Sequence, residues 1–356
     1  MYKTSELELN KLLALTLERN ASDLHLIVGE PPIIRVDSAL MRLEDYQVLS
    51  KDVVDDLSSV LLHEQQRDLY AKQQDVDLSY AFKDNTRFRV NVYRQQGMPS
   101  IAFRLIPNTI KTLEELNLPP TLHKFTEPKQ GLVLVVGPTG HGKSTALASM
   151  INTINNTRSE HILTIEDPVE FMFTPKKSVI SQREVNLDTP SFAQALKAAL
   201  REDINVVLVG EIRDLESISA ALTLAETGHL IFATMHTNDA AQSVDRIVDV
   251  FPGDQQSQIR AQLASVLIGV ASLRLMPKVG GGRLPAYEIM LMNHAVRNVI
   301  RDNKVYQINN IIQTSYEEGM VSLDRSLASL VKQGLVELEV AQDFVTDREY
   351  FMSLIS

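Results

Sequence analysis

Hydrophobic and polar positions in the first hundred residues follow two periods, one near 3.6 and the other of 2. The helical period predicts helices at 5–19, 50–62 and 64–72, and the alternating period predicts strands at 22–28, 33–43, 75–82, 86–93 and 100–106. Gly97 and Pro99 join the last two strands, which predicts a hairpin. This order predicts a small α+β domain with an antiparallel sheet over residues 1–106.

From residue 131 onwards, short apolar runs alternate with amphipathic segments. The pattern predicts strands at 132–136, 162–166, 206–210 and 229–235 and helices at 144–156, 191–201, 214–226 and 239–249. Such alternation is typical of a mostly parallel α/β sheet. After about residue 255 the pattern becomes mainly helical, with helices at 255–269, 293–302, 308–314, 322–333 and 337–344 and strands at 270–276 and 285–291.

Four prolines punctuate the stretch between the two parts, at positions 107, 119, 120 and 128. Such punctuation is typical of a connection between domains. We therefore expect a first domain at 1–106, a linker at 107–120, an α/β core at 121–254 and an appended helical subdomain at 255–356.

The strongest chemical signal is the stretch 131–145, GLVLVVGPTGHGKST. Its spacing is that of a phosphate-binding loop, and it lies between a predicted strand and a predicted helix, as that motif requires. Glycines let the backbone curl around phosphate, the lysine reaches the β- and γ-phosphates, and the serine hydroxyl binds Mg²⁺. The alternative is a glycine turn with a chance lysine. The nucleotide-binding candidates are Gly137, Pro138, Thr139, Gly140, His141, Gly142, Lys143, Ser144 and Thr145.

Two acidic residues follow the next predicted strand. Glu166 and Asp167 leave the strand at 162–166, at the sheet edge that faces the ligand crevice in parallel folds. Carboxylates there can orient Mg²⁺ or the attacking water. A solvated strand end with Pro168 as its breaker explains them equally well on spacing alone.

A third acid ends the apolar strand in VVLVGEIRD. Gly210 stands where an aspartate is usual, so Glu211 is the candidate general base and direct metal binding by a carboxylate there is in doubt. The alternative is a surface ion pair between Arg213 and Asp214.

Two histidines flank the strand at 229–235. His229 opens it and His236 follows it, so His236 has the stronger case for reaching a γ-phosphate. A structural role is the commoner one for a lone histidine at a strand end. Four arginines lie on the strands of the first domain, at Arg87, Arg89, Arg94 and Arg104. They are either a solvated face, which spacing alone favours, or arginine fingers for a neighbouring subunit.

Composition narrows the class of protein. The chain has no cysteine, which excludes disulfides, a thiolate nucleophile and cysteine-bound zinc, and fits a reducing cytoplasmic setting. The formal net charge of −10 disfavours nucleic acid as a partner. No apolar run is long enough to span a bilayer, and the acidic amphipathic N-terminal segment argues against a secretory signal.

Together these motifs resemble PilT-type ATPases, the retraction motors of type IV pili in the secretion ATPase superfamily. Besides the phosphate loop, the matching stretches are SDLHL (22–26), RFRVNVY (87–93), FRLIP (103–107), ILTIEDPVEF (162–171), SQREV (181–185), ALREDINVVLVGEIRD (199–214), AETGHLIFATMHT (225–237) and DRIVDVFP (245–252). They run along nearly the whole chain in the family's order.

The resemblance implies a PAS-like first domain and a RecA-like ATPase core, assembled as a homo-hexameric ring that uses ATP and Mg²⁺. Carried over by position, it implies catalytic roles for Glu211, Glu166, His236 and His229, metal binding by Ser144, Glu166 and Asp167, and nucleotide contacts from Arg89 and Arg104, with Arg87 a weaker candidate.

The family's extension ATPases carry a tetracysteine motif that this chain lacks. The stretch 295–302, AVRNVIRD, is close to the AIRNLIRE of retraction ATPases. We therefore expect a motor for pilus retraction and twitching motility, cytoplasmic and peripheral at the inner face of the membrane at the pilus base. Its expected partners are an inner-membrane platform protein and a paralogous retraction ATPase, and not nucleic acid. The alternatives are an accessory PilU-like ATPase, a nucleic-acid translocase and a scaffold that turns over slowly.

Two features depart from the family. His141 stands in the loop where the family usually has serine, and the tail after about residue 340 matches nothing in it.

Overall fold

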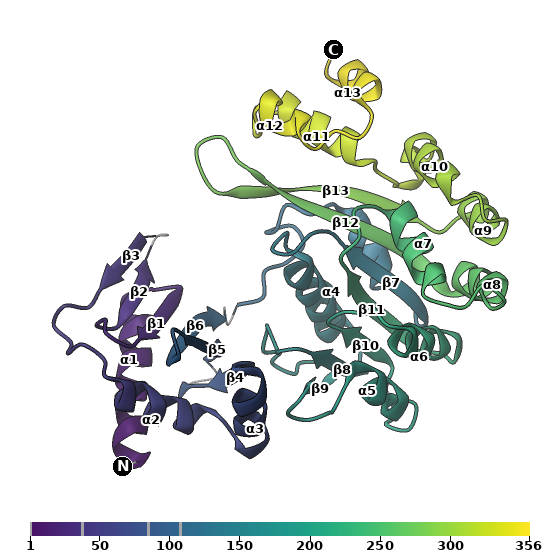
Figure 1. Ribbon diagram of the computed structural model, residues 1–356. Helices are drawn as coiled ribbons and strands as arrows, with labels where there is room; N and C mark the ends of the chain where they lie inside the picture. Colours follow the sequence, from purple (N-terminus) through teal and green to yellow (C-terminus); the bar gives the residue numbers. More distant parts are fainter. Residues whose placement is uncertain (1, 37–38, 84–85, 107–108) are drawn as a thin grey trace. The chain divides into compact units, whose positions relative to one another are not determined.

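The computed structural model describes residues 2–36, 39–83, 86–106 and 109–356. The chain forms two compact units (Figure 1). The first holds the residues up to Thr109 together with Asp167–Met172, and the second holds Ile110–Glu166 and Phe173–Ser356. The first two residues of the predicted linker, 107–108, lie outside the described residues.

The first unit is a six-stranded antiparallel sheet with helices on one face. Its strand order is β3-β2-β1-β6-β5-β4. The strands are β1 (Asp23–Ile27), β2 (Ile33–Val36), β3 (Ala39–Arg42), β4 (Asp75–Ala81), β5 (Arg87–Gln95) and β6 (Met98–Ile106), and the helices are α1 (Tyr2–Glu18), α2 (Lys51–Leu61) and α3 (Glu64–Gln73). The predicted hairpin is present, because Gln96 and Gly97 both adopt positive φ between β5 and β6, as a tight hairpin turn requires.

The core of the first unit follows from the alternation of its strands. Phe88, Val90 and Val92 of β5 point to the helices, where they pack with leucines of α1 and α2. The intervening residues, Arg87, Arg89 and Asn91, therefore lie on the opposite, polar face.

The second unit is built on a seven-stranded sheet of order β13-β12-β7-β11-β10-β8-β9. Its strands are β7 (Gly131–Val136), β8 (His161–Glu166), β9 (Val179–Glu184), β10 (Val206–Val209), β11 (Leu230–Met235), β12 (Leu267–Pro277) and β13 (Arg283–Leu291). All neighbours are parallel except β12 and β13. The mostly parallel α/β fold predicted from the sequence is confirmed.

Helices cover both faces of this sheet (Figure 1). The helices α5 (Phe192–Ala199), α6 (Leu215–Glu226), α7 (Ala240–Asp249) and α8 (Gln256–Val266) bury one face, and α4 (Lys143–Thr157) packs against β7 and β11. The remaining helices are α9 (His294–Arg301), α10 (Ile308–Thr314), α11 (Leu323–Lys332), α12 (Leu338–Gln342) and α13 (Arg348–Ile355).

The central sheet extends beyond the boundary expected at residue 254. Strand β12 pairs in parallel with β7, and β13 pairs with β12, so both strands belong to the same sheet as the phosphate loop. The sequence placed both strands but assigned them to an appended helical subdomain. Pairing between segments more than a hundred residues apart leaves no local pattern, which is why the sequence missed it.

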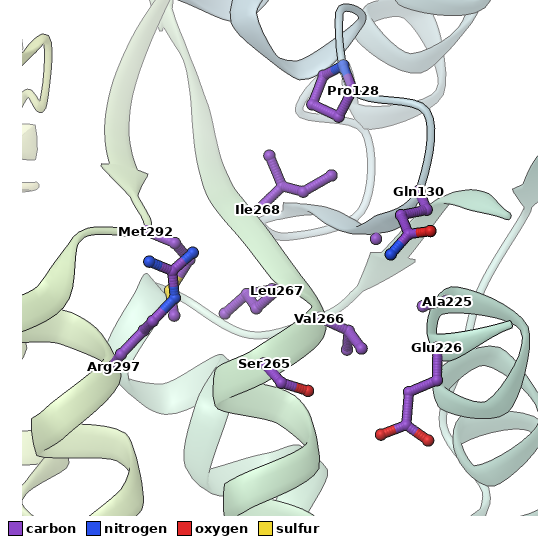
Figure 2. A pocket seen from close by; sticks show the side chains of 11 residues that line it. Pro128, Gln130, Ala225, Glu226, Ser265, Val266, Leu267, Ile268, Met292 and Arg297 are labelled. Atoms are coloured by element: carbon purple, nitrogen blue, oxygen red, sulfur yellow. The ribbon is translucent and has the colours of Figure 1, made fainter. Parts of the chain in front are cut away.

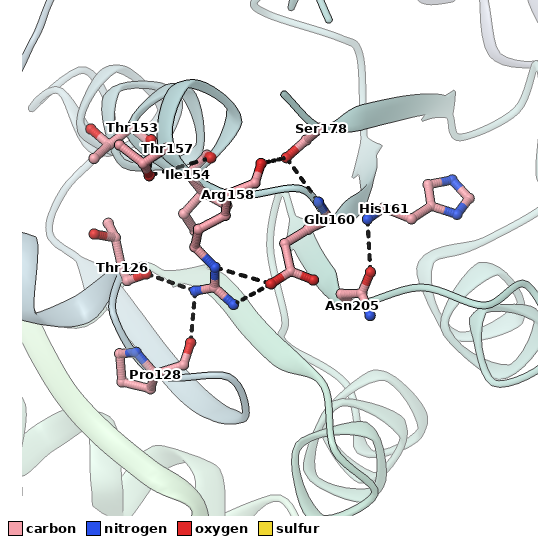
Figure 3. Close-up of polar contacts among 10 residues, drawn as sticks. All are labelled: Thr126, Pro128, Thr153, Ile154, Thr157, Arg158, Glu160, His161, Ser178 and Asn205. Carbon is pink, nitrogen blue, oxygen red and sulfur yellow. Dashed lines mark hydrogen bonds and ion pairs between the residues drawn. The ribbon is translucent and has the colours of Figure 1, made fainter. Parts of the chain in front are cut away.

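One arginine fixes the stretch that leads into β7 (Figure 3). Arg158 Nη1 donates to the carbonyls of Thr126 and Pro128 at 2.7 and 2.8 Å, and its Nε and Nη2 donate to Glu160 Oε1 at 3.1 and 2.8 Å. The side chains of Arg158 and Glu160 are 18% and 19% exposed, so this ion pair is largely shielded from solvent. It stabilises the sheet edge where the parallel strands begin.

Among the residues described, no helix is both long and apolar enough to cross a membrane.

Candidate active site

The carboxyl ends of four parallel strands bring the candidate residues of the second unit to one edge. Val136 at the end of β7 is level with Met235 of β11, and Val209 of β10 is level with Ala233 of β11 and Ile165 of β8. The segments that leave β7, β10 and β11 carry the phosphate loop, Glu211 and His236, and Glu166 is the last residue of β8. An edge of this kind is where open parallel sheets bind their ligands.

The phosphate loop is held in a shape that needs glycine. Gly137, Gly140 and Gly142 have φ of 139°, 79° and 85°, a region that other residues rarely adopt. A Cβ on Gly137 would lie 2.5 Å from the carbonyl oxygen of Leu273. Helix α4 begins at Lys143 with no side-chain cap, so its first amides are oriented for an anion.

Lys143 is folded back into the loop. It is 8% exposed, and its Nζ donates to the carbonyl oxygens of Gly137 and Pro138 at 2.9 and 3.0 Å. The same Nζ lies 3.4 Å from Nδ1 of His236. The lysine is therefore positioned over the loop with neutral carbonyl acceptors among its partners.

His236 joins the loop to the acid that follows β10. Its Nδ1 lies 3.4 Å from both Lys143 Nζ and Thr139 Oγ1, and its Nε2 lies 3.3 Å from Glu211 Oε2. An ammonium can only donate, so Nδ1 accepts and the ring proton resides on Nε2, facing the carboxylate. The tautomer assigned in this way makes His236 a bridge between Lys143 and Glu211.

Glu211 also forms an ion pair with Arg213, whose Nη1 lies 3.2 Å from Oε1. The alternative of an Arg213–Asp214 surface pair is wrong. Asp214 instead caps α6, where its carboxylate accepts the Ser217 amide at 2.8 Å and the Ser217 hydroxyl at 3.0 Å.

Glu166 is buried, with 7% of its surface exposed. Its Oε1 accepts the Thr164 hydroxyl at 2.8 Å, and Gln182 Nε2 lies 3.5 Å away. Glu166 is therefore not a solvated residue at a strand end. Asp167 is exposed and begins the segment that groups with the first unit.

His229 lies at the other edge of the sheet. Its backbone oxygen accepts the amide of Gly131, at the start of β7, and its Nδ1 lies 3.0 Å from the carbonyl oxygen of Leu224. The six residues of β11 separate it from His236 by about 20 Å. Within one chain, the two histidines for which the resemblance implies catalytic roles therefore lie at opposite edges of the sheet.

Three of the four arginines, Arg87, Arg89 and Arg104, lie on the polar face of the first unit's sheet, whereas Arg94 lies over the ring of Tyr70 in α3. Arg89 and Arg104 are directly opposite each other on β5 and β6, and Asp23 of β1 is opposite Arg104. Arg104 Nε donates to Asp23 Oδ1 at 2.9 Å, and Arg89 lies 3.6 Å from Asp77. Burial acts to raise the pKa of Asp23, but the hydrogen bonds from Ser22 and Arg104 outweigh it and hold that pKa below its ordinary value.

A buried arginine at this edge was missed from the sequence. Arg274 on β12 is 8% exposed, and its Nη2 donates to the backbone and side-chain oxygens of Asn238 at 3.0 and 2.9 Å. Asn238 follows His236 by two residues, so Arg274 braces the segment that carries the histidine. The available signal was a lone charge in the apolar run 263–276.

A cavity of about 470 Å³ lies away from this cluster (Figure 2). Gln130 and Gly131 at the start of β7, Glu226 at the end of α6 and Arg297 of α9 are among its lining residues. It therefore lies at the edge where the strands begin, opposite the phosphate loop, and it is not the phosphate site.

Comparison with known proteins identifies the family of this chain. Residues 3–342 match the family described as Type II/IV secretion system protein, and the chain belongs to that family. Over 337 residues it is 45% identical to the protein named Type IV pilus retractation ATPase PilT of Pseudomonas aeruginosa, an alignment that covers 95% of this chain and 98% of the relative. Over 312 residues it is 48% identical to the Twitching motility protein of Neisseria gonorrhoeae, covering 87% of this chain and 83% of the relative.

The fold is also similar to that of a solved structure from the same family. A crystal structure described as the pilus retraction motor PilT with bound ADP has a TM-score of 0.89 at 44% identity, covering 96% of this chain and 98% of that one. The fold class, the family and the ATPase class of activity predicted from the sequence are confirmed.

Proposed function

We propose that this chain is the subunit of an ATP-hydrolysing motor that powers retraction of type IV pili. The observation that carries the proposal is the meeting of Lys143, His236 and Glu211 beside the glycine loop. The names of its relatives, which refer to pilus retraction and twitching, support the same output, and the ADP in the similar crystal structure supports nucleotide as the ligand.

The phosphate loop binds the nucleotide. Its backbone amides and the first amides of α4 surround the β-phosphate, because the three glycine φ values turn the loop around that point. Lys143 exchanges its carbonyl acceptors for β- and γ-phosphate oxygens, which are stronger acceptors because they are charged. Thr145 donates to the α-phosphate.

The metal site is made of hard oxygen donors. No group of three or more histidine, aspartate or glutamate side chains in the described part of the chain is arranged to hold a metal ion. Mg²⁺ does not need such a group, because it usually keeps water and phosphate ligands and takes only one or two ligands from the protein. The Ser144 hydroxyl and the carboxylates of Glu166 and Asp167 are the donors proposed here. When bound, Mg²⁺ neutralises charge on the phosphates.

Hydrolysis uses Glu211 as the general base. Its carboxylate takes a proton from the attacking water, and His236 Nε2, 3.3 Å from Oε2, faces that oxygen and orients it. His236 also contacts Lys143. The same imidazole therefore contacts both the lysine that binds phosphate and the glutamate that activates water. Nδ1 of His236 faces Lys143 while Nε2 faces the base.

The motor is proposed to act as a homo-hexamer at the inner face of the cytoplasmic membrane, where a platform protein and a paralogous ATPase are its partners. Arg104 is 73% exposed on the polar face of the first unit, beside Arg89. Both are proposed to contact nucleotide. His229, distant from the loop of its own chain, is proposed to act on the nucleotide of a neighbouring subunit.

The test is complementation of a bacterium that makes type IV pili but lacks its retraction ATPase. We expect the wild-type chain to restore twitching and Lys143→Ala to fail at equal protein level, with ATP turnover and the mass in solution measured on the same purified proteins. If the wild-type chain hydrolyses ATP as a hexamer but restores twitching only when a second retraction ATPase is present, the accessory role replaces the one proposed.

A further inference from the structure

The imidazole of His141 makes a contact outside the phosphate loop. Its Nδ1 accepts the backbone N–H of Leu275, on β12, at 2.9 Å. This is the position where the chain departs from the serine usual in the family it resembles. A serine side chain is shorter by a whole ring and could not bridge the same gap.

Leu275 lies in the part of β12 that is no longer paired with β7. Strand β12 pairs with β7 only as far as Ser272, which is level with Val136, and beyond that point it pairs with β13 alone. The Leu275 amide therefore faces the side where β7 has turned into the phosphate loop. A half-buried strand amide needs an acceptor, and His141 supplies it.

Strand β12 supports the loop at two further points. The carbonyl oxygen of Leu273 lies 2.5 Å from where a Cβ on Gly137 would stand, and the side chain of Leu275 lies 3.8 Å from the same point on Gly142. The strand thus lies against the first and last glycines of the loop. The hydrogen bond to His141 fastens the loop to this strand at the residue directly before Gly142.

The surroundings of His141 keep its ring neutral. Burial lowers the pKa of His141, and the positive charges of Arg274 on β12, Lys143 in the loop and Arg283 on β13 lower it further. A neutral ring whose Nδ1 accepts a hydrogen bond carries its proton on Nε2. The acceptor that Leu275 needs is therefore available at neutral pH.

We propose that His141 is a positioning residue, whose Nδ1 fastens the phosphate loop to β12 and so holds the loop in the shape that receives nucleotide. The proposal rests on the nucleotide-binding function put forward above. It assigns His141 an effect through backbone geometry, carried by the hydrogen bond between its Nδ1 and the Leu275 amide.

The experiment measures ADP affinity by calorimetry on the full chain, for wild type and four variants at position 141. Losing one hydrogen bond predicts roughly three- to tenfold weaker binding for His141→Ala and His141→Ser. His141→Asn keeps an acceptor at the Nδ1 position and stays within about twofold of wild type, whereas His141→Gln, with its acceptor near the Nε2 position, behaves like the alanine variant. His294→Ala, an exposed histidine on α9, is the control and is expected to match wild type.

Hydrogen exchange at the Leu275 amide reports the contact itself and needs no nucleotide. We expect slow exchange in wild type and His141→Asn and fast exchange in His141→Ala. The proposal is overturned if His141→Ala binds ADP as tightly as wild type, if His141→Asn is as weak as His141→Ala, or if Leu275 exchange is unchanged. If wild type fails to bind ADP at all, the proposed function is wrong, and the exchange data still decide whether the bond to β12 exists.

Discussion

Nε2 of His236 lies 3.3 Å from Oε2 of Glu211, and this contact links the residue proposed as base to the histidine that touches the loop lysine. The two ring nitrogens have separate partners, so two amide substitutions can separate their roles. Asparagine presents its amide near Nδ1, and glutamine presents its amide near Nε2.

We expect His236→Asn to keep the contacts with Lys143 and Thr139 but to lose the one with Glu211. Its kcat should fall by about tenfold or more, since the close contact that orients the carboxylate of the base is removed, while ADP affinity changes by less than about threefold. His236→Gln should retain more turnover than His236→Asn. Steady-state kinetics and ADP titration check both variants. Equal loss in the two would mean that the contact with Glu211 does not orient the base.

The first glycine of the loop offers a test of backbone geometry. Gly137→Ala places a Cβ 2.5 Å from the Leu273 oxygen at a φ of 139°, so the loop or β12 must move. We expect a loss of about 2 kcal/mol in unfolding free energy and at least tenfold weaker ADP binding. Gly253→Ala is the control, because no heavy atom lies within 4 Å of its added Cβ and its φ is not in the positive region. A Gly137→Ala protein that binds ADP like wild type would show that the loop does not need this backbone shape.

The loop and the parallel strands could be predicted because their signals are local. An apolar run followed by spaced glycines, Lys143 and Ser144 specifies strand, loop and helix within fifteen residues, and the structure has that order. Strand β9 was missed, since four of the six residues of Val179–Glu184 are polar and the strand is only partly buried at the edge of the sheet. Its hydrogen bonds are with β8, which the sequence of β9 does not encode.

The site was predicted less completely than the fold. The contact between His236 and Glu211 follows from adjacent strands ending at one edge, which the alternation of strands implies. Arg274 and the Leu275 amide, which hold Asn238 and His141 in place, both belong to β12. No sequence pattern assigned that strand to the position next to β7. The separation of His229 from His236 could have been predicted from the sequence. A residue that precedes a strand lies at the opposite edge of the sheet from one that follows the same strand.

Glu288 makes the free energy of unfolding depend on pH. It is buried on β13, where its Oε1 accepts the Ala240 amide at the start of α7. Burial raises the pKa of the Glu288 carboxyl to about 7, and the nearby Asp239 and Asp324 act in the same direction. Between its ordinary pKa of 4.5 and this value, the unfolded chain has lost a proton that the folded chain keeps.

Stability should therefore fall as pH rises from about 4.5 to about 7 and then level off, by on the order of 3 kcal/mol in total. Glu288→Gln keeps an oxygen acceptor for Ala240 and has no proton to lose, so this part of the slope should disappear. Urea unfolding at several pH values measures it. A Glu288→Gln protein with the same slope as wild type would assign the pH dependence to other groups.

The measurement that most directly tests the central claim is steady-state ATP turnover of purified wild type and Glu211→Gln, with ADP affinity measured on both. Removing a general base predicts a fall in kcat of about a hundredfold or more, and the unchanged loop predicts ADP affinity within about threefold of wild type. Glu216→Gln, an exposed acid in the first turn of α6, is the matched control and should keep wild-type turnover. A Glu211→Gln protein that retains half or more of wild-type turnover would contradict the assignment of Glu211 as the base and with it the mechanism proposed for this motor.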